Sequence, residues 1–270
     1  MSFTSVALAS AGQVPAAGDT FTGPSPGDFW QPMFGAGAWA FTRPMGVSLI
    51  LTILLAVWLV AATRRAAAVP TKGQHYVEYI YNFVRNDIGR DMIGSKDFRP
   101  FTPLLFALFT FILVHNLAGI TPPFQNPPTA RIGFALALVM VVYLVYHYVG
   151  FRKHGVGGYF KSMVPSGLPG WIFPFILIIE AATKFFIQPL TLTLRLFGNM
   201  FAGHMVLVLF ILGGEFLLFH GQGLMKLASI ASFSGGVLMT VFEILIQFLQ
   251  AYVFTLLTAS YIGASLAEDH

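Results

Sequence analysis

The sequence has no cysteine and few charged residues. Of its 270 residues, 56% are hydrophobic and 10% are charged, whereas a soluble domain has roughly 25% charged residues. Without cysteine, disulfides and thiolate metal sites are excluded. The chain also lacks a G-x-x-x-x-G-K-[ST] phosphate loop, zinc-ligand spacing and a G-x-S-x-G nucleophile elbow. We therefore expect an integral membrane protein that binds no metal or cofactor and is not an enzyme on its own.

Long apolar runs indicate an all-α fold with about five membrane-crossing helices. A run of about 20 apolar residues suffices to cross the hydrocarbon core, and the predicted spans are 44–63, 101–121, 132–151, 171–214 and 227–266. Residues 75–92 place apolar and charged side chains at helical spacing. They predict an amphipathic helix on the membrane surface, the alternative being a loop helix that packs on the protein. Residues 44–270 then form one membrane domain after an irregular outer segment, residues 1–43.

The basic residues indicate an orientation. Ten of the fifteen lysines and arginines fall within residues 64–99 and 152–161. Because lysine and arginine mark the cytoplasmic side, we expect the N-terminus outside and the C-terminus in the cytoplasm. These residues cluster at the ends of apolar spans, which is typical of a protein in a lipid bilayer and not of one that binds nucleic acid.

The last two apolar runs are longer than a bilayer requires. As helices they would be about 60 Å long, twice the hydrocarbon thickness, so they must lie strongly tilted or bend, and Pro189 is the expected bend. Alternatively each run holds two short spans, with Gly235 and Gly236 in a hidden turn. A turn at residues 220–223 predicts an antiparallel hairpin in which residue i lies opposite residue 445 minus i.

Arg195 is the one formal charge within residues 190–210. A guanidinium stays protonated and costs roughly 3 kcal/mol at the bilayer centre on insertion scales. It is expected to face a partner or a wet cavity that brings an anionic group. Gly198, Asn199 and Ala202 share its helical face, and the small residues would let a neighbouring helix approach closely. His204 lies half a turn away and is expected to point into the fold.

The predicted hairpin brings further polar residues to matching depths. Arg195 is expected opposite Gln250, and His204 close to Glu243. With Gln247 they would line a wet passage that offers protons a relay of titratable and hydrogen-bonding groups. The alternatives are interhelical hydrogen bonds for the glutamines and a structural ion pair for His204 with Glu243. Outside this group, the candidates for the outer entry are His115 and Asn116, which also suit plain packing, and the candidate for a cytoplasmic passage is Glu180.

Two segments carry a family resemblance. Residues 195–204, R-L-F-G-N-M-F-A-G-H, resemble the signature of the a subunit of F-type ATP synthases, and residues 250–258, Q-A-Y-V-F-T-L-L-T, resemble the final helix of that family. The resemblance implies the stator a subunit of the membrane (Fo) sector. This subunit stands beside a ring of c subunits and provides two offset half-channels that couple proton flow to rotation and ATP synthesis. It also implies a b-subunit peripheral stalk and other synthase subunits as partners.

The resemblance further implies roles for individual residues. Arg195 would be the essential cation that faces the c-ring carboxylate and separates the half-channels. The residues implied for the outer half-channel and its relay are His204, Glu243, Gln250 and Asn199. Glu180 would serve the cytoplasmic half-channel, although its spacing to Pro189 is one residue longer than in the family. We expect the chain in a bacterial plasma membrane.

The main alternative is an ion-coupled secondary transporter of an anionic solute, since intramembrane arginine, histidine and glutamate suit such a site. Transporters of this kind usually contain internal repeats with two broken helices in matched halves. The sequence shows no such repeat. A purely structural assembly subunit is a third possibility, and it leaves Arg195 without a role.

Overall fold

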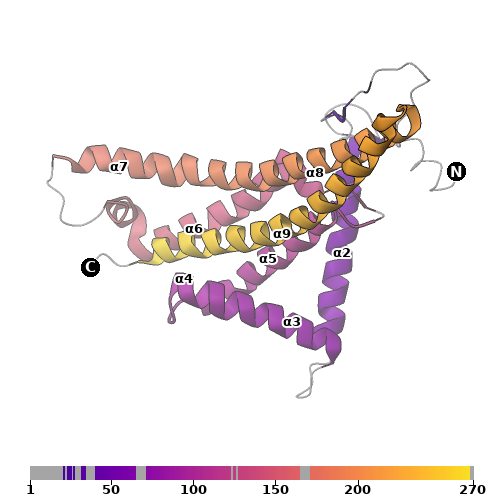
Figure 1. Ribbon diagram of the computed structural model, residues 1–270. Coiled ribbons are helices and arrows are strands. Elements are labelled where there is room, and N and C mark those ends of the chain that lie inside the picture. Colours follow the sequence, from indigo (N-terminus) through magenta and orange to yellow (C-terminus); the bar gives the residue numbers. More distant parts are fainter. Residues whose placement is uncertain are drawn as a thin grey trace.

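The computed structural model describes residues 21, 23–25, 27, 32–34, 40–64, 71–122, 124–125, 127–164 and 171–267. Most of the predicted outer segment, residues 1–43, lies outside them. Within the described residues five helices are long and apolar enough to cross a membrane. They are α2 (Arg43–Thr63), the segment Arg99–Leu117 that contains α5 (Thr102–Leu117), α6 (Ile132–Lys161), the continuous α7–α8 (Phe173–His220) and α9 (Leu224–Leu266). The all-α membrane fold is confirmed (Figure 1).

Shorter elements complete the described chain. Two strands pair antiparallel just before α2: β1 (Pro32–Phe34) and β2 (Phe41–Thr42). A helical segment follows α2 and consists of α3 (Lys72–Phe83), the π-helix η3 (Val84–Arg90) and α4 (Asp91–Ile93). Thr71 caps its start, because its hydroxyl accepts a hydrogen bond from the backbone of Gln74. Two 3₁₀ turns flank α5: η4 (Arg99–Phe101) and η5 (Pro128–Ala130).

The bounds of several helices differ from the predicted ranges. Helix α5 ends at Leu117, four residues before the expected end, because the chain then closes tight turns ahead of its prolines. Helix α6 runs ten residues beyond Phe151, and the backbone kinks within it at Gly155. Helix α8 ends at His220 and not at Gly214, and Ser232 and Phe233 of α9 lie against it at Gly213 and Gly214. Hydropathy therefore located the spans, while turns and packing set their ends.

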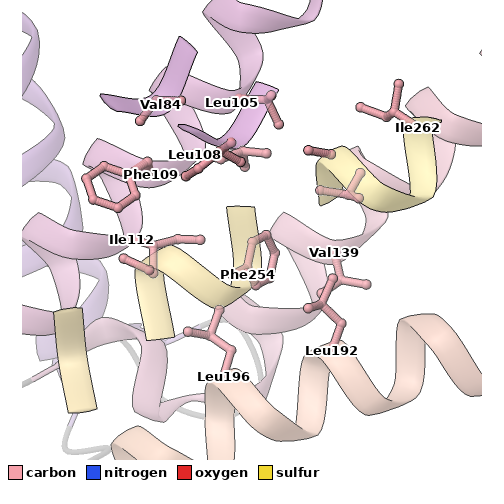
Figure 2. Packing of buried hydrophobic residues seen from close by; sticks show 14 of the residues in the cluster. Val84, Leu105, Leu108, Phe109, Ile112, Val139, Leu192, Leu196, Phe254 and Ile262 are labelled. Atoms are coloured by element: carbon pink, nitrogen blue, oxygen red, sulfur yellow. The ribbon is translucent and has the colours of Figure 1, made fainter. Parts of the chain in front are cut away.

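One apolar core joins the bundle. Figure 2 shows Leu105, Phe109 and Ile112 of α5 in one cluster with Phe254 of α9 and Leu196 of α8. All five are buried. In a bilayer such side chains gain little by leaving lipid, so close van der Waals packing holds the helices together. This core fixes α8 against α9, and the functional side chains of both helices depend on that placement.

The amphipathic segment packs part of its apolar stripe on the protein. Val84 and Ile88 are fully buried in the core that η3 shares with α5 and α9. Tyr76 and Tyr79 on α3 are largely exposed. The segment is therefore a surface helix that is also fastened to the bundle, as the packing alternative expected.

A close approach between α4 and α9 gives a first testable prediction. A methyl group on Gly263 would overlap the backbone carbonyl of Met92, and backbone cannot move aside as a flexible side chain would. We expect Gly263→Ala to push α4 away and to cost about 1–3 kcal/mol, measured as a lower apparent Tm of the detergent-purified complex. The control is Gly133→Ala, because a methyl group there meets nothing within 4 Å. An unchanged Tm for Gly263→Ala would contradict the packing argument.

The last two helices form the expected antiparallel hairpin. Gly221, Gln222 and Gly223 connect them, and Gly223 has φ 55°, a conformation that favours glycine. Asn199 Nδ2 donates to Gln250 Oε1 at 2.8 Å, and Ser232 Oγ donates to the Phe210 carbonyl at 2.7 Å. The numbers of these partners add to 449 and 442, on either side of the predicted 445. Helix α9 is continuous from Leu224 to Leu266, so a hidden turn at Gly235 and Gly236 is wrong.

The other long helix is also continuous, with one irregular segment. The π-helix η6 (Thr183–Ile187) joins α7 (Phe173–Ala182) to α8 (Gln188–His220) just before Pro189. A proline removes one backbone donor, and a local π-turn accommodates that loss. In Figure 1 the long helices run at a steep angle to α2, as expected if α2 stands across the membrane and they lie tilted within it.

Candidate functional site

Four polar side chains of the α8–α9 pair are buried in the protein interior. The exposed fractions are 4% for His204, 1% for Glu243, 0% for Gln247 and 2% for Gln250. The three residues of α9 follow each other at helical spacing, so they share one face. The predicted polar stripe therefore faces the protein and not lipid.

These side chains leave several polar atoms without protein partners. Glu243 and Gln247 lie one helical turn apart and interact through their side chains, but neither the carboxyl oxygens nor the amide atoms make a hydrogen bond of good geometry to a described residue. The Glu243 carboxyl group lies over Gly203, with Oε1 3.6 Å from the position that a Cβ there would take. Because Gly203 directly precedes His204, the acid of α9 reaches α8 at the level of the histidine. Buried polar groups of this kind are normally satisfied by ordered water.

Arg195 borders a cavity of about 290 Å³. The residues around this cavity are Arg195, Asn199, Ile246, Leu249, Gln250 and Val253. The Arg195 side chain is half-buried, and within the described part of the chain no carboxylate lies at ion-pair distance from its guanidinium. Asn199 and Gln250 hydrogen-bond to each other across the helix pair. The predicted proximity of Arg195 and Gln250 is therefore observed at this cavity.

The small residues beside Arg195 lie on an open face of α8. Ala202 and Asn199 are exposed, and a Cβ on Gly198 would meet no atom within 4 Å. Large apolar side chains continue the same surface, with Leu194 48% and Leu249 51% exposed. The described part of the chain leaves this face uncovered, so its apolar surface is available to lipid or to another protein.

His204 opens to a different cavity, also of about 290 Å³. Its walls come from three elements. Helix α8 contributes His204, Leu207, Val208, Ile211 and Leu212, α9 contributes Thr240, and the α5–α6 connection contributes Gly119, Ile120 and Gln125. Arg195 and His204 thus border different cavities, in agreement with their expected placement on opposite faces of α8.

His115 and Asn116, the candidates for the outer entry, border neither of these two cavities. His115 is buried, and its ring contacts the Phe111 carbonyl at 2.8 Å and Ser48 Oγ at 3.1 Å, so it ties α5 to α2. Asn116 accepts a hydrogen bond from Thr129 through Oδ1, while its buried Nδ2 has no partner among the described residues. The contacts of His115 fit the packing alternative better than a channel role.

Glu180 lies apart from the buried polar row, which consists of His204, Glu243, Gln247 and Gln250. It is half-buried on α7, one helical turn before η6. Figure 1 shows α7 at the far end of the long helix from the hairpin turn. The structure therefore gathers His204, Glu243, Gln247 and Gln250, and it leaves Glu180 at a distance. Among the residues that the structure describes, no three His, Asp or Glu side chains gather as metal ligands would.

Comparison with known proteins agrees with this arrangement. The family model of the ATP synthase A chain matches residues 45–263, which include both cavities and all five crossing helices apart from a few terminal residues. The chain belongs to the ATP synthase A chain family. The membership predicted from residues 195–204 and 250–258 is thus confirmed, and the polar row and Arg195 lie within the matched region.

Curated relatives in this family are similar over most of their length. The ATP synthase subunit a of a Nocardioides species is 41% identical over 94% of this chain and 96% of its own length. The subunit a of Pseudarthrobacter chlorophenolicus is 41% identical over 85% of this chain and 87% of its own, and that of Rhodococcus erythropolis is 37% identical over 94% of each. The chain is thus an integral membrane ATP synthase subunit a of bacterial type.

Sequence reasoning missed the part that the α5–α6 connection takes in the site. Gly119, Ile120 and Gln125 border the His204 cavity. Gly119 and Ile120 were expected inside the second span, 101–121, and the proline-rich stretch with Gln125 was expected only to join two spans. The available signal was a connection that is short and rich in proline, which restricts the paths that its backbone can follow.

Proposed function

We propose that this chain is the stator a subunit of the Fo sector, with Arg195 as the fixed cation that faces a carboxylate on each passing c subunit. The observation that carries the proposal is that Arg195 lacks a counter-charge in the described chain. It has no carboxylate of the described chain within ion-pair distance, and it lies beside a face where Gly198 and Ala202 leave room for a neighbouring helix. Leaving a guanidinium without its counter-charge in a membrane is costly, so a partner is expected to supply the anion.

The electrostatics of this pair convert rotation into proton transfer. A rotor carboxyl group that faces lipid is stable only when it is neutral, since a bare charge there is strongly disfavoured. Beside Arg195 the ionised form is favoured, because a nearby opposite charge lowers the pKa of a carboxyl group. Each carboxyl group therefore releases its proton on approach and takes up another on departure. Arg195 keeps its own proton, which prevents a direct leak between the two sides.

The buried polar row supplies the outer half-channel in this proposal. His204 opens to its cavity, and Glu243, Gln247 and Gln250 continue inward along α9 toward Arg195. Their buried polar atoms need water as partners. A chain of water molecules beside two titratable groups can pass protons, while Asn199 and Gln250 hold the inner end of the path through their hydrogen bond. His115 and Asn116 stay candidates for the entry.

The orientation and partners follow from the same proposal. The hairpin turn, residues 221–223, faces outward, so the N-terminus is outside and the C-terminus is in the cytoplasm of a bacterium. Glu180, near the cytoplasmic end of the long helix, belongs to the second half-channel. The c-subunit ring packs on the face around Ala202, and the b-subunit peripheral stalk and the other synthase subunits complete the assembly in the lipid bilayer.

The transporter alternative has less support. Solute carriers of that kind use helices that unwind near the bilayer midplane in two matched halves. Helix α9 is continuous, and the irregular segment of the other long helix, Thr183–Ile187, is a π-helix and not an unwound break. Large apolar side chains, Ile246, Leu249 and Val253, also border the Arg195 cavity. These features favour a helical partner over a soluble anionic solute.

Cross-linking in the purified synthase tests the proposed rotor face. Because the chain has no cysteine, each introduced thiol is the only one in this subunit. Ala202→Cys places the thiol on the open face, and we expect a disulfide to a cysteine in the c-subunit helix that carries the carboxylate. Leu196→Cys is the matched control, because Leu196 is one of the buried core residues of the same helix. Equal yields from the two positions, or none from Ala202→Cys, would argue against a rotor on this face.

A further inference from the structure

Described residues of the connection between α5 and α6 lie against the middle of α8, where His204 is located. Gln125 and Ile120 border the His204 cavity from this connection. The backbone carbonyl of Gln125 lies within hydrogen-bonding reach of the His204 ring, and both residues border the same cavity. The histidine therefore contacts a main-chain atom of a connecting segment as well as the neighbouring helices.

Gln125 has an unusual backbone conformation. Its φ is 40°, and it is the one residue other than glycine with positive φ in the part of the chain that the structure describes. Residues other than glycine avoid this region, and they hold such a conformation only where the surroundings impose it. Strained backbone of this kind is found preferentially at functional sites.

Contacts on both sides of Gln125 impose its conformation. Before it, the Thr121 carbonyl accepts backbone hydrogen bonds from Phe124 at 3.0 Å and from Gln125 at 3.3 Å. After it, Pro127 lies so close to Gly119 that an added Cβ there would be 3.1 Å away. Thr129 Oγ1 then donates to Asn116 Oδ1 at 2.7 Å, which ties the connection back to α5. The Gln125 carbonyl is therefore held in place from both directions.

We propose that Gln125 is a positioning residue for His204, whose backbone carbonyl fixes the orientation of the imidazole ring and the nitrogen that carries its proton. The inference rests on the proposed role of His204 in the outer half-channel. A histidine ring has two distinct nitrogens, and a hydrogen bond to one decides what the other can do. With one nitrogen fixed on Gln125, the other is presented to the cavity and to Glu243 across the helix pair.

Three substitutions at Gln125 separate its backbone from its side chain. Asparagine tolerates positive φ and glycine adopts it freely, whereas valine is strongly disfavoured there. We expect Gln125→Asn and Gln125→Gly to keep more than half of wild-type ATP-driven proton pumping in membrane vesicles. Gln125→Val is expected to lose about tenfold, the factor that corresponds to the conformational penalty. Ile132→Val, directly after the same connection, is the control, because its side chain is 50% exposed and does not border the cavity.

The pH profile of pumping distinguishes positioning from a general structural defect. Glu243 on α9 is the titratable side chain at the level of His204. His115 on α5 is engaged with α2. On the helices packed against α8, Tyr143 and His147 of α6 contact Phe185, and Tyr261 of α9 interacts with Arg195. We expect Gln125→Val to change the pH profile, and we expect no further change when it is combined with His204→Gln. Rates are divided by the amount of this subunit in the purified complex. If Gln125→Val fails to assemble, Gln125→Ala takes its place. We expect Gln125→Ala to pump more slowly than Gln125→Gly and to show a displaced pH profile.

Three results would overturn the inference. They are a wild-type pH profile for both Gln125→Val and Gln125→Ala, a loss in Gln125→Gly as large as in Gln125→Val, or the same fold-loss from Gln125→Val with and without His204. The proposed function fails separately. If His204→Gln itself pumps like wild type, the outer half-channel is misplaced; if His204→Gln is impaired and Gln125→Val is not, only the positioning role is wrong.

Discussion

Replacing Arg195 by alanine or lysine is expected to abolish ATP-driven proton pumping in vesicles that contain the assembled synthase. Breaking a buried charge pair by removing one partner costs about 3–5 kcal/mol, which corresponds to a loss of about a hundredfold or more. In Arg195→Ala no positive charge lowers the pKa of the rotor carboxyl group at the interface. The carboxyl group therefore retains its proton, and no proton is exchanged.

Lysine fails for a different reason. It carries the same formal charge, but its ammonium group releases a proton readily when it is desolvated, and it lacks the planar fork of donors that suits a carboxylate. The Arg195 side chain is half-buried beside Asn199 and Gln250, where such desolvation operates. We therefore expect Arg195→Lys to be as inactive as Arg195→Ala, although a simple charge requirement would predict rescue.

The control for both variants is Arg64→Lys, because Arg64 is exposed just beyond α2 and remote from either cavity. Pumping is followed by the quenching of a pH-sensitive dye after ATP is added, and the subunit content is checked by immunoblot. Wild-type pumping by Arg195→Lys or Arg195→Ala would refute the assigned role. Loss of the subunit from the membrane would instead show a defect in assembly, and the Ala202→Cys cross-link then tests the rotor face independently.

Hydropathy and helical periodicity predict most of this fold. An uninterrupted apolar run has few stable conformations in a bilayer, because every backbone group must bond within its own segment. The hairpin register was predictable as well, since one short glycine-containing turn joins two helices whose rise per residue is fixed. The bond between Asn199 and Gln250 lies within four residues of the expected register.

Other features depend on contacts that periodicity does not contain. The end of α6 depends on a kink at Gly155, and the packing of the amphipathic segment depends on the close approach of Met92 to Gly263. The Gln125 backbone is set by neighbours on both sides of it, among them Pro127 and Gly119. The Met92 and Gln125 contacts are tertiary effects that override local preference, and the Gln125 contact shapes the surroundings of His204.

Exchanging the two titratable residues of the outer half-channel is expected to preserve part of its function. We predict that His204→Glu combined with Glu243→His pumps more than either single variant. Each single change places two like groups together, whereas the double variant again pairs an imidazole with a carboxyl group. Gly203 has no side chain where the Glu243 carboxyl group now lies, which leaves room on α8 for a changed partner. The measurement is a double-mutant cycle on pumping rates, with an expected coupling of about 1–3 kcal/mol.

A neutral pair distinguishes a proton relay from a structural ion pair. If His204 and Glu243 only hold α8 against α9, the variant His204→Gln with Glu243→Gln keeps a hydrogen-bonding pair and is expected to pump. If they carry protons, this variant assembles and stays inactive, because an amide does not titrate. The buried Glu243 carboxyl oxygens lack well-formed bonds to the described residues, and an ion pair kept for stability would have formed them. We therefore expect the neutral pair to be inactive and the exchanged pair to be active; losses that simply add in the exchanged pair would contradict the coupling.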